Sequence, residues 1–113
     1  MNVGLCKGRH VMKTNEREEM DCYLFTTVDK PTATDEHEKV CREFITNFLY
    51  YDSMGDYEDI NLYITGLTPL LTSFLKCWVE RQEHLEMGAG SLVLWHWDTE
   101  VKQYIPQRWA VIT

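Results

Sequence analysis

The segment from Ile60 to Asp98 constrains the fold most, because it contains the pattern of a strand, a capped helix and a second strand in succession. Residues 60–65 form a short run rich in β-branched and aromatic side chains, which predicts a strand. Thr68 is a good N-cap and Pro69 suits the first helical position, so we expect a helix to begin there. Its apolar side chains recur with the spacing of one buried helical face: Leu70, Leu71, Phe74, Leu75, Trp78 and Val79.

Residues 91–97, Ser-Leu-Val-Leu-Trp-His-Trp, are apolar on both faces for most of their length, as in a central parallel strand. Together with the preceding strand and helix they predict a right-handed βαβ unit. A ligand site in such a unit would lie at the turn Thr65, Gly66, Leu67 and Thr68, where the first strand meets the helix N-terminus.

The rest of the chain supplies more elements of the same two kinds. Strands are expected at residues 2–6 and 22–28, and a helix at residues 34–50, with Val40, Cys41, Phe44 and Ile45 on its apolar stripe. Residues 103–112 predict a returning antiparallel strand, which Pro106 places at a sheet edge or a bulge. The predicted fold is one α/β domain over residues 1–113, small and Rossmann-like. It has a mostly parallel sheet, two main helices and a C-terminal antiparallel hairpin.

The charge balance excludes one class of partner. With a formal net charge of −7, the chain shows no basic stripe of the kind that binds long DNA or RNA. No apolar run is long enough to span a membrane, so a cytoplasmic protein is expected. The four cysteines have no CxxC pair or zinc-ligand spacing, and Cys41 and Cys77 are expected to be buried reduced thiols. We expect no metal and no cofactor.

The turn formed by Thr65, Gly66, Leu67 and Thr68 is the strongest candidate ligand site. Hydroxyl groups beside helix-N-terminal amides can hold a phosphate or a carboxylate. The turn matches neither the GxxxxGK[ST] nor the GxGxxG phosphate-binding pattern. The alternative is purely structural: Thr68 caps the helix and Gly66 makes the turn.

A second candidate is the loop Lys7, Gly8, Arg9 and His10 after the first strand. Glycine allows close backbone approach, arginine offers a bidentate fork, and histidine can donate a proton. The alternative is a solvated polar loop near the terminus.

His96 and Asp98 stand at the carboxyl end of the strand at residues 91–97. His96 could contact a base or transfer a proton, and Asp98 could accept hydrogen bonds from ribose hydroxyls. The alternative is a hydrogen-bonded hairpin end. His37, in the first turn of the other helix, is expected to be solvated. Classical catalytic patterns such as GxSxG and HExxH are absent from the sequence.

Residues 62–69, followed by a helix, residues 92–98 and a hairpin, resemble the core of CARF domains. These are Rossmann-like sensors and ring nucleases for cyclic oligoadenylates in CRISPR defence. The resemblance implies that Thr65, Gly66 and Thr68 contact a nucleotide, that the Lys7 to His10 loop lies nearby, and that a dimer forms the pocket. The chain also resembles small phage and prophage proteins of uncharacterised function, which suggests a role in counter-defence.

The leading functional prediction is binding of a small anionic nucleotide, such as a cyclic oligonucleotide, for sensing or sequestration. Whether the chain is an enzyme is left open; if it is one, the resemblance implies a metal-independent ring nuclease. The alternative is an acidic protein-interaction module that inhibits a host defence protein. An exposed strand edge near Pro106, or an aromatic-rich end of the molecule, would also allow pairing with a second copy, so a homodimer is an open alternative.

Overall fold

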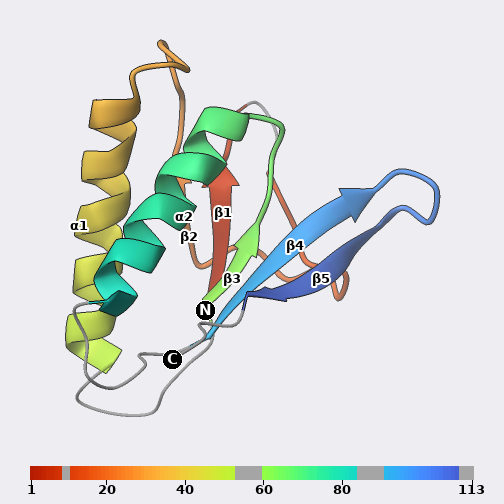
Figure 1. Ribbon diagram of the computed structural model, residues 1–113. Coiled ribbons are helices and arrows are strands. Elements are labelled where there is room, and N and C mark those ends of the chain that lie inside the picture. Colours follow the sequence, from red (N-terminus) through yellow and green to blue (C-terminus); the bar gives the residue numbers. More distant parts are fainter. Residues whose placement is uncertain (9–10, 53–59, 84–90, 110–113) are drawn as a thin grey trace.

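The computed structural model describes residues 1–8, 11–52, 60–83 and 91–109. They form one five-stranded sheet with two helices (Figure 1). The elements are β1 (Asn2–Cys6), β2 (Cys22–Phe25), α1 (Thr34–Asp52), β3 (Ile60–Tyr63), α2 (Thr68–Glu83), β4 (Leu92–Asp98) and β5 (Gln103–Trp109). The predicted α/β fold with a mostly parallel sheet and a C-terminal antiparallel hairpin is confirmed. The strands β2 and β3 end earlier than predicted, and residues 110–112 of the last predicted strand lie outside the described residues.

The strand order is β2-β1-β3-β4-β5. The first four strands are parallel, with Val3 opposite both Cys22 and Leu62, and Leu62 opposite Leu94. Strand β4 lies between β3 and β5, as its two apolar faces predict. Strand β5 runs antiparallel along the edge, where Pro106 removes no hydrogen bond from the interior of the sheet.

Both helices cover the same face of the sheet and pack against each other (Figure 1). The core beneath them is apolar, and its largest fully buried side chains include Leu5, Ile45, Leu62, Phe74 and Trp78. The predicted stripes are wrong at one position in each helix, since Val40 is 38% exposed and Val79 is 41% exposed. On α1 the buried side chains are instead His37, Cys41 and Ile45, which are spaced four residues apart. They lie on one face of the helix, and Val40 lies to the side of that face.

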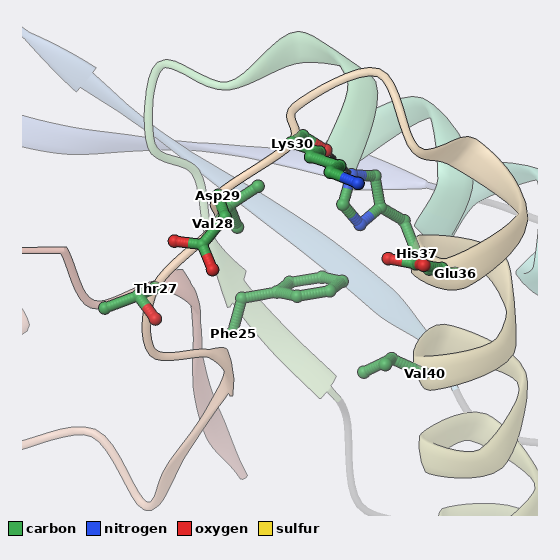
Figure 2. Close-up of a pocket in the computed structure, with 8 residues that line it drawn as sticks. All are labelled: Phe25, Thr27, Val28, Asp29, Lys30, Glu36, His37 and Val40. Carbon is green, nitrogen blue, oxygen red and sulfur yellow. Dashed lines mark hydrogen bonds between the residues drawn. The ribbon is translucent and has the colours of Figure 1, made fainter.

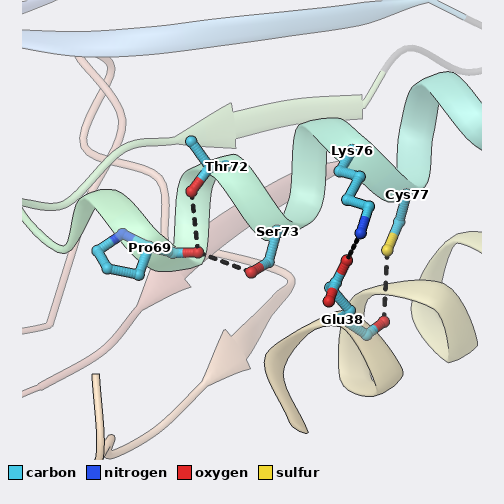
Figure 3. Close-up of polar contacts among 6 residues, drawn as sticks. All are labelled: Glu38, Pro69, Thr72, Ser73, Lys76 and Cys77. Atoms are coloured by element: carbon cyan, nitrogen blue, oxygen red, sulfur yellow. Dashed lines mark hydrogen bonds and ion pairs between the residues drawn. The ribbon is translucent and has the colours of Figure 1, made fainter. Parts of the chain in front are cut away.

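The contact between α1 and α2 includes the buried thiol of Cys77 and an ion pair between Lys76 and the largely buried Glu38 (Figure 3). Lys76 Nζ lies 2.5 Å from Glu38 Oε1, and this carboxylate raises the pKa of the lysine. The Cys77 thiol donates to the Glu38 carbonyl oxygen at 3.4 Å. Burial raises the pKa of the Cys41 thiol to about 12. Cys41 and Cys77 are therefore the buried reduced thiols that the sequence predicts.

The other face of the sheet is covered by the connecting arm, which we define as residues 11–21 between β1 and β2 (Figure 1). The arm contains no helix; a single bridge between Lys13 and Glu19 closes a small hairpin. Its Met12 amide donates to the Tyr23 hydroxyl at 3.0 Å, and its Asn15 side chain reaches β5, 89 positions further along the chain. The arm thus ties both edges of the sheet together.

An aromatic row lies on this second face and consists of Trp95, Tyr63, Tyr104 and Trp97. Tyr63 stacks on Trp95 with ring centroids 5.5 Å apart and meets the edge of Tyr104 at 4.8 Å. Tyr104 in turn lies 5.1 Å from Trp97. The row extends from the buried centre of the sheet to its exposed hairpin, because Tyr63 is 3% exposed and Trp97 is 51% exposed.

Candidate functional site

The two loops singled out in the sequence begin at the same end of the sheet, where its parallel strands have their carboxyl ends. Strands β1 and β3 are parallel neighbours, so residues 7–8 and 64–68 follow their carboxyl ends side by side. The two connections then diverge. The connecting arm, which follows β1, passes over one face of the sheet, whereas α2, which follows β3, covers the opposite face (Figure 1). In an open α/β sheet, this reversal point is where a ligand crevice forms.

On the β1 side of this reversal point lie Lys7 and Gly8. Gly8 has a φ of +56°, which favours glycine, and its amide donates to the Thr26 carbonyl at 3.0 Å. The Lys7 ammonium lies 6.0 Å from the centroid of the Tyr23 ring. Arg9 and His10, the other two predicted residues of this loop, lie outside the described residues.

The β3 side is built by the turn from Thr65 to Thr68. Thr68 begins α2, as predicted, and Leu67 packs against the core. Gly66 is exposed, has a φ outside the left-handed region, and has no atom within 4 Å of the position that a Cβ would take. The Thr65 hydroxyl is buried, and no residue in the described part of the chain hydrogen-bonds to it.

His96 and Asp98 lie on the part of β4 that extends beyond β3. His96 Nε2 lies 2.8 Å from Gln107 Oε1, and Asp98 Oδ1 accepts from the Glu100 amide at 2.8 Å. Both side chains thus hold the hairpin together, as the structural alternative predicted. Within the described ranges no hydrogen bond joins either of them to the Thr65–Thr68 turn. Their part in ligand binding stays a prediction.

A separate hollow of about 310 Å³ lies between the end of β2 and the first turns of α1 (Figure 2). Phe25 forms its floor, with Asp29 on one side and Glu36 and Val40 on the other. The hollow is lined by two carboxylates and one ammonium group, that of Lys30, so its net negative charge disfavours an anionic ligand such as a nucleotide.

His37, on the wall of this hollow, is only 5% exposed, and the prediction that it is solvated is wrong. Its Nε2 lies 3.1 Å from the carbonyl oxygens of both Lys30 and Pro31, and its ring meets Phe25 edge-to-face at 5.4 Å. Because both partners are acceptors, Nε2 carries a proton and donates. Sequence reasoning missed this role, and the one available signal was the i, i+4 spacing of His37 with Cys41 and Ile45.

In the described residues, no group of three or more His, Cys, Asp or Glu side chains could hold a metal ion. The same part of the chain has no helix that is both long and apolar enough to cross a membrane. No protein-family model, curated protein or solved structure matches the chain. The resemblance to CARF domains therefore stays a prediction that depends on residues 62–69 and 92–98.

Proposed function

We propose that this protein binds a small anionic ligand of the nucleotide class in the crevice between the carboxyl ends of β1 and β3. The observation that carries the proposal is the strand order β2-β1-β3-β4-β5. It puts the reversal of chain direction between β1 and β3, and the loops after these two strands contain Lys7, Gly8 and the Thr65–Thr68 turn.

The N-terminus of α2 favours an anion more than that of α1. Helix α1 has Asp35 and Glu36 in its first turn, and these carboxylates complement the positive end of its dipole. Helix α2 is sixteen residues long and has no acidic residue in its first turn. The positive end of its dipole is therefore not neutralised by its own side chains, and an anion can be stabilised there.

Two features of the turn are not explained by the fold. Nothing in the backbone conformation or the local packing requires glycine at position 66. A missing side chain at an exposed turn is useful where a ligand approaches the main chain. The Thr65 hydroxyl, buried without a partner among the described residues, is a polar group of the kind that a ligand or a water molecule would satisfy. Both features support a binding role.

We rank binding above cleavage. Binding an anion requires amides, hydroxyls and a cation, and the segments after β1 and β3 contain Lys7, the Thr68 hydroxyl and the α2 N-terminus. Hydrolysis also requires a general acid or base, and the predicted candidate His96 is engaged with Gln107. Sensing or sequestration of a nucleotide signal is thus the function that we propose, with cyclic oligonucleotides as the first ligands to test.

The test is native mass spectrometry of the full chain with cyclic dinucleotides, cyclic oligoadenylates and NAD-derived nucleotides, followed by chromatography of the released ligand. We expect an intact nucleotide to bind, and Thr68→Val and Lys7→Ala to weaken its binding by about tenfold or more. Thr72→Val is the matched control, because this exposed hydroxyl donates only to carbonyls within α2, to that of Thr68 at 3.0 Å and to that of Pro69 at 3.2 Å (Figure 3).

Recovery of a linear product would make the protein a ring nuclease. Absence of binding across the panel, or equal losses in Thr68→Val and Thr72→Val, would overturn the proposal. Thermal unfolding of each variant separates a binding defect from loss of the fold, since a lost N-cap alone costs about 1 kcal/mol.

A further inference from the structure

We infer that the end of the β4–β5 hairpin is a docking surface for a basic segment of a partner protein, with Trp97 as its anchor. This surface, the hairpin end, comprises residues 96–105. It is distinct from the crevice between β1 and β3, so the inference does not depend on the proposed nucleotide binding.

The hairpin end projects from the sheet. The last residue of β3, Tyr63, pairs with Trp95, so the following residues of β4 have β5 as their strand neighbour on one side and no strand on the other. Figure 1 shows the hairpin extending away from both helices. The β4 edge of this two-stranded segment is therefore open to a partner.

Exposed apolar side chains lie at the turn and on both faces where the hairpin projects, because Trp97 pairs with Tyr104 whereas Ile105 pairs with His96. Trp97 is 51% exposed, Val101 is 57% exposed and Ile105 is 44% exposed. In the described residues, seven large apolar side chains are exposed, and three of them lie in the hairpin end. A surface hairpin without a partner usually has polar residues there, and exposed apolar clusters mark interaction sites.

The hairpin end is also held rigid. Asp98 Oδ1 accepts from the amides of Glu100 and Val101, and the Lys102 amide donates to the Asp98 carbonyl at 2.8 Å. Trp97 meets the edge of Tyr104, whose main chain is fixed by Asn15. A rigid anchor loses little conformational entropy on binding, and tryptophan is the residue type most often found at binding hot spots.

The hairpin end has two carboxylates, Asp98 and Glu100, against one ammonium group, Lys102, and this net negative charge favours a basic partner. The carboxylates of Asp98 and Glu100 line an open hollow of about 490 Å³ together with Trp97 and Ile105. The Glu100 carboxylate makes no ion pair or hydrogen bond within the described part of the chain. A partner arginine could lay its guanidinium on the Trp97 ring and reach a carboxylate, whereas a nucleic acid would be repelled. The net charge of −7 would also steer a basic protein toward this molecule.

The test is selection of a random peptide display library against the immobilised full chain, with binding of the enriched peptides measured by fluorescence polarisation. We expect enriched peptides to contain arginine beside an apolar residue. Trp97→Ala and Glu100→Lys should each weaken their binding by about tenfold or more. Val79→Ala is the matched control, because Val79 is an exposed apolar residue on α2. Val101→Ser, at the exposed turn, is a second variant that leaves the aromatic row intact.

Peptides that bind Trp97→Ala as tightly as the parent chain, acidic peptides, or no enrichment over the bare support would each overturn the inference. A dimer in analytical ultracentrifugation that Trp97→Ala dissociates would also overturn it, because the occupant would then be a second copy. Urea unfolding of each variant confirms that the fold is intact. A nucleotide-binding defect in Thr68→Val with unchanged peptide binding would show that the two sites are separate.

Discussion

The side chain of Asn15 makes both hydrogen bonds that a neighbouring strand would make to the main chain of Tyr104. Its Nδ2 donates to the Tyr104 carbonyl at 3.0 Å, and its Oδ1 accepts from the Tyr104 amide at 2.9 Å. Two residues further along β5, Pro106 has no amide proton to offer. The connecting arm and this proline together close the sheet edge that the sequence offered for pairing with a second copy. A homodimer that used this edge would have to displace Asn15.

We expect Asn15→Ala to lower the free energy of unfolding by about 1–2 kcal/mol, because two partly solvated hydrogen bonds are lost. Urea unfolding followed by circular dichroism measures this change. Asn47→Ala is the matched control, since Asn47 is exposed on α1 and alanine favours a helix. Equal stability of the two variants would contradict the role assigned to Asn15. Stronger self-association of Asn15→Ala in analytical ultracentrifugation would show that the freed edge can pair.

Gly4 lies opposite Tyr23 on the face that the connecting arm covers. A Cβ atom at position 4 would lie 2.5 Å from two carbon atoms of the Tyr23 ring and 3.3 Å from the Met12 sulfur. The ring is restrained, because its hydroxyl accepts from the Met12 amide. We therefore expect Gly4→Ala to destabilise the fold by about 1–3 kcal/mol.

The control for Gly4→Ala is Gly66→Ala, which meets no atom within 4 Å and has no left-handed φ to strain. Its free energy of unfolding should stay the same or rise by about 0.4–1 kcal/mol. Differential scanning calorimetry of both variants tests the contrast, and a Gly4→Ala protein as stable as the parent chain would refute it.

The parts of the fold that the sequence predicts are those that local patterns determine. The pattern at Thr68-Pro69 and apolar runs such as 92–94 specify elements within a few neighbouring residues, and the βαβ rule then orders them. The connecting arm could not be predicted in this way. It has no period, and its key contact joins residues 89 positions apart through one polar side chain.

The same distinction applies to the candidate site, whose residues can be named from local patterns but whose arrangement depends on distant contacts. Lys7 and Thr65 lie at the same end of the sheet because β1 and β3 are parallel neighbours. The strand patterns make this arrangement reasonable but do not specify it. The buried role of His37 depends on two carbonyl groups in the preceding loop, and a main-chain acceptor has no signature in the sequence.

His37 is expected to contribute far more to stability than His96. His37→Ala removes a buried donor shared by two carbonyl oxygens and an edge-to-face contact with Phe25, which together should cost about 2–3 kcal/mol. His96→Ala removes one exposed hydrogen bond to Gln107 and should cost about 1 kcal/mol or less. Urea unfolding of the two variants under identical conditions measures the difference. Equal losses would show that the contacts of His37 do not stabilise α1.

The ionisation of Tyr63 makes the stability of the fold change with pH in the alkaline range. The pKa of its hydroxyl is raised to about 12, chiefly by burial and to smaller extents by Glu16, Tyr104 and Glu18. In the unfolded chain the same group titrates near its ordinary value of 10. Between these two pH values the unfolded chain has released the proton while the folded chain retains it. Stability therefore falls as pH rises through this window.

The measurement is the urea midpoint of the parent chain and of Tyr63→Phe at intervals from pH 9 to about pH 12. Phenylalanine keeps the ring stacked on Trp95 but cannot ionise, so the variant should lose less stability across the window than the parent chain. Some loss should remain, because burial also raises the pKa of Tyr104. Identical pH profiles for the two proteins would mean that the arm does not keep Tyr63 away from water. In that case the covered aromatic face would be open in solution.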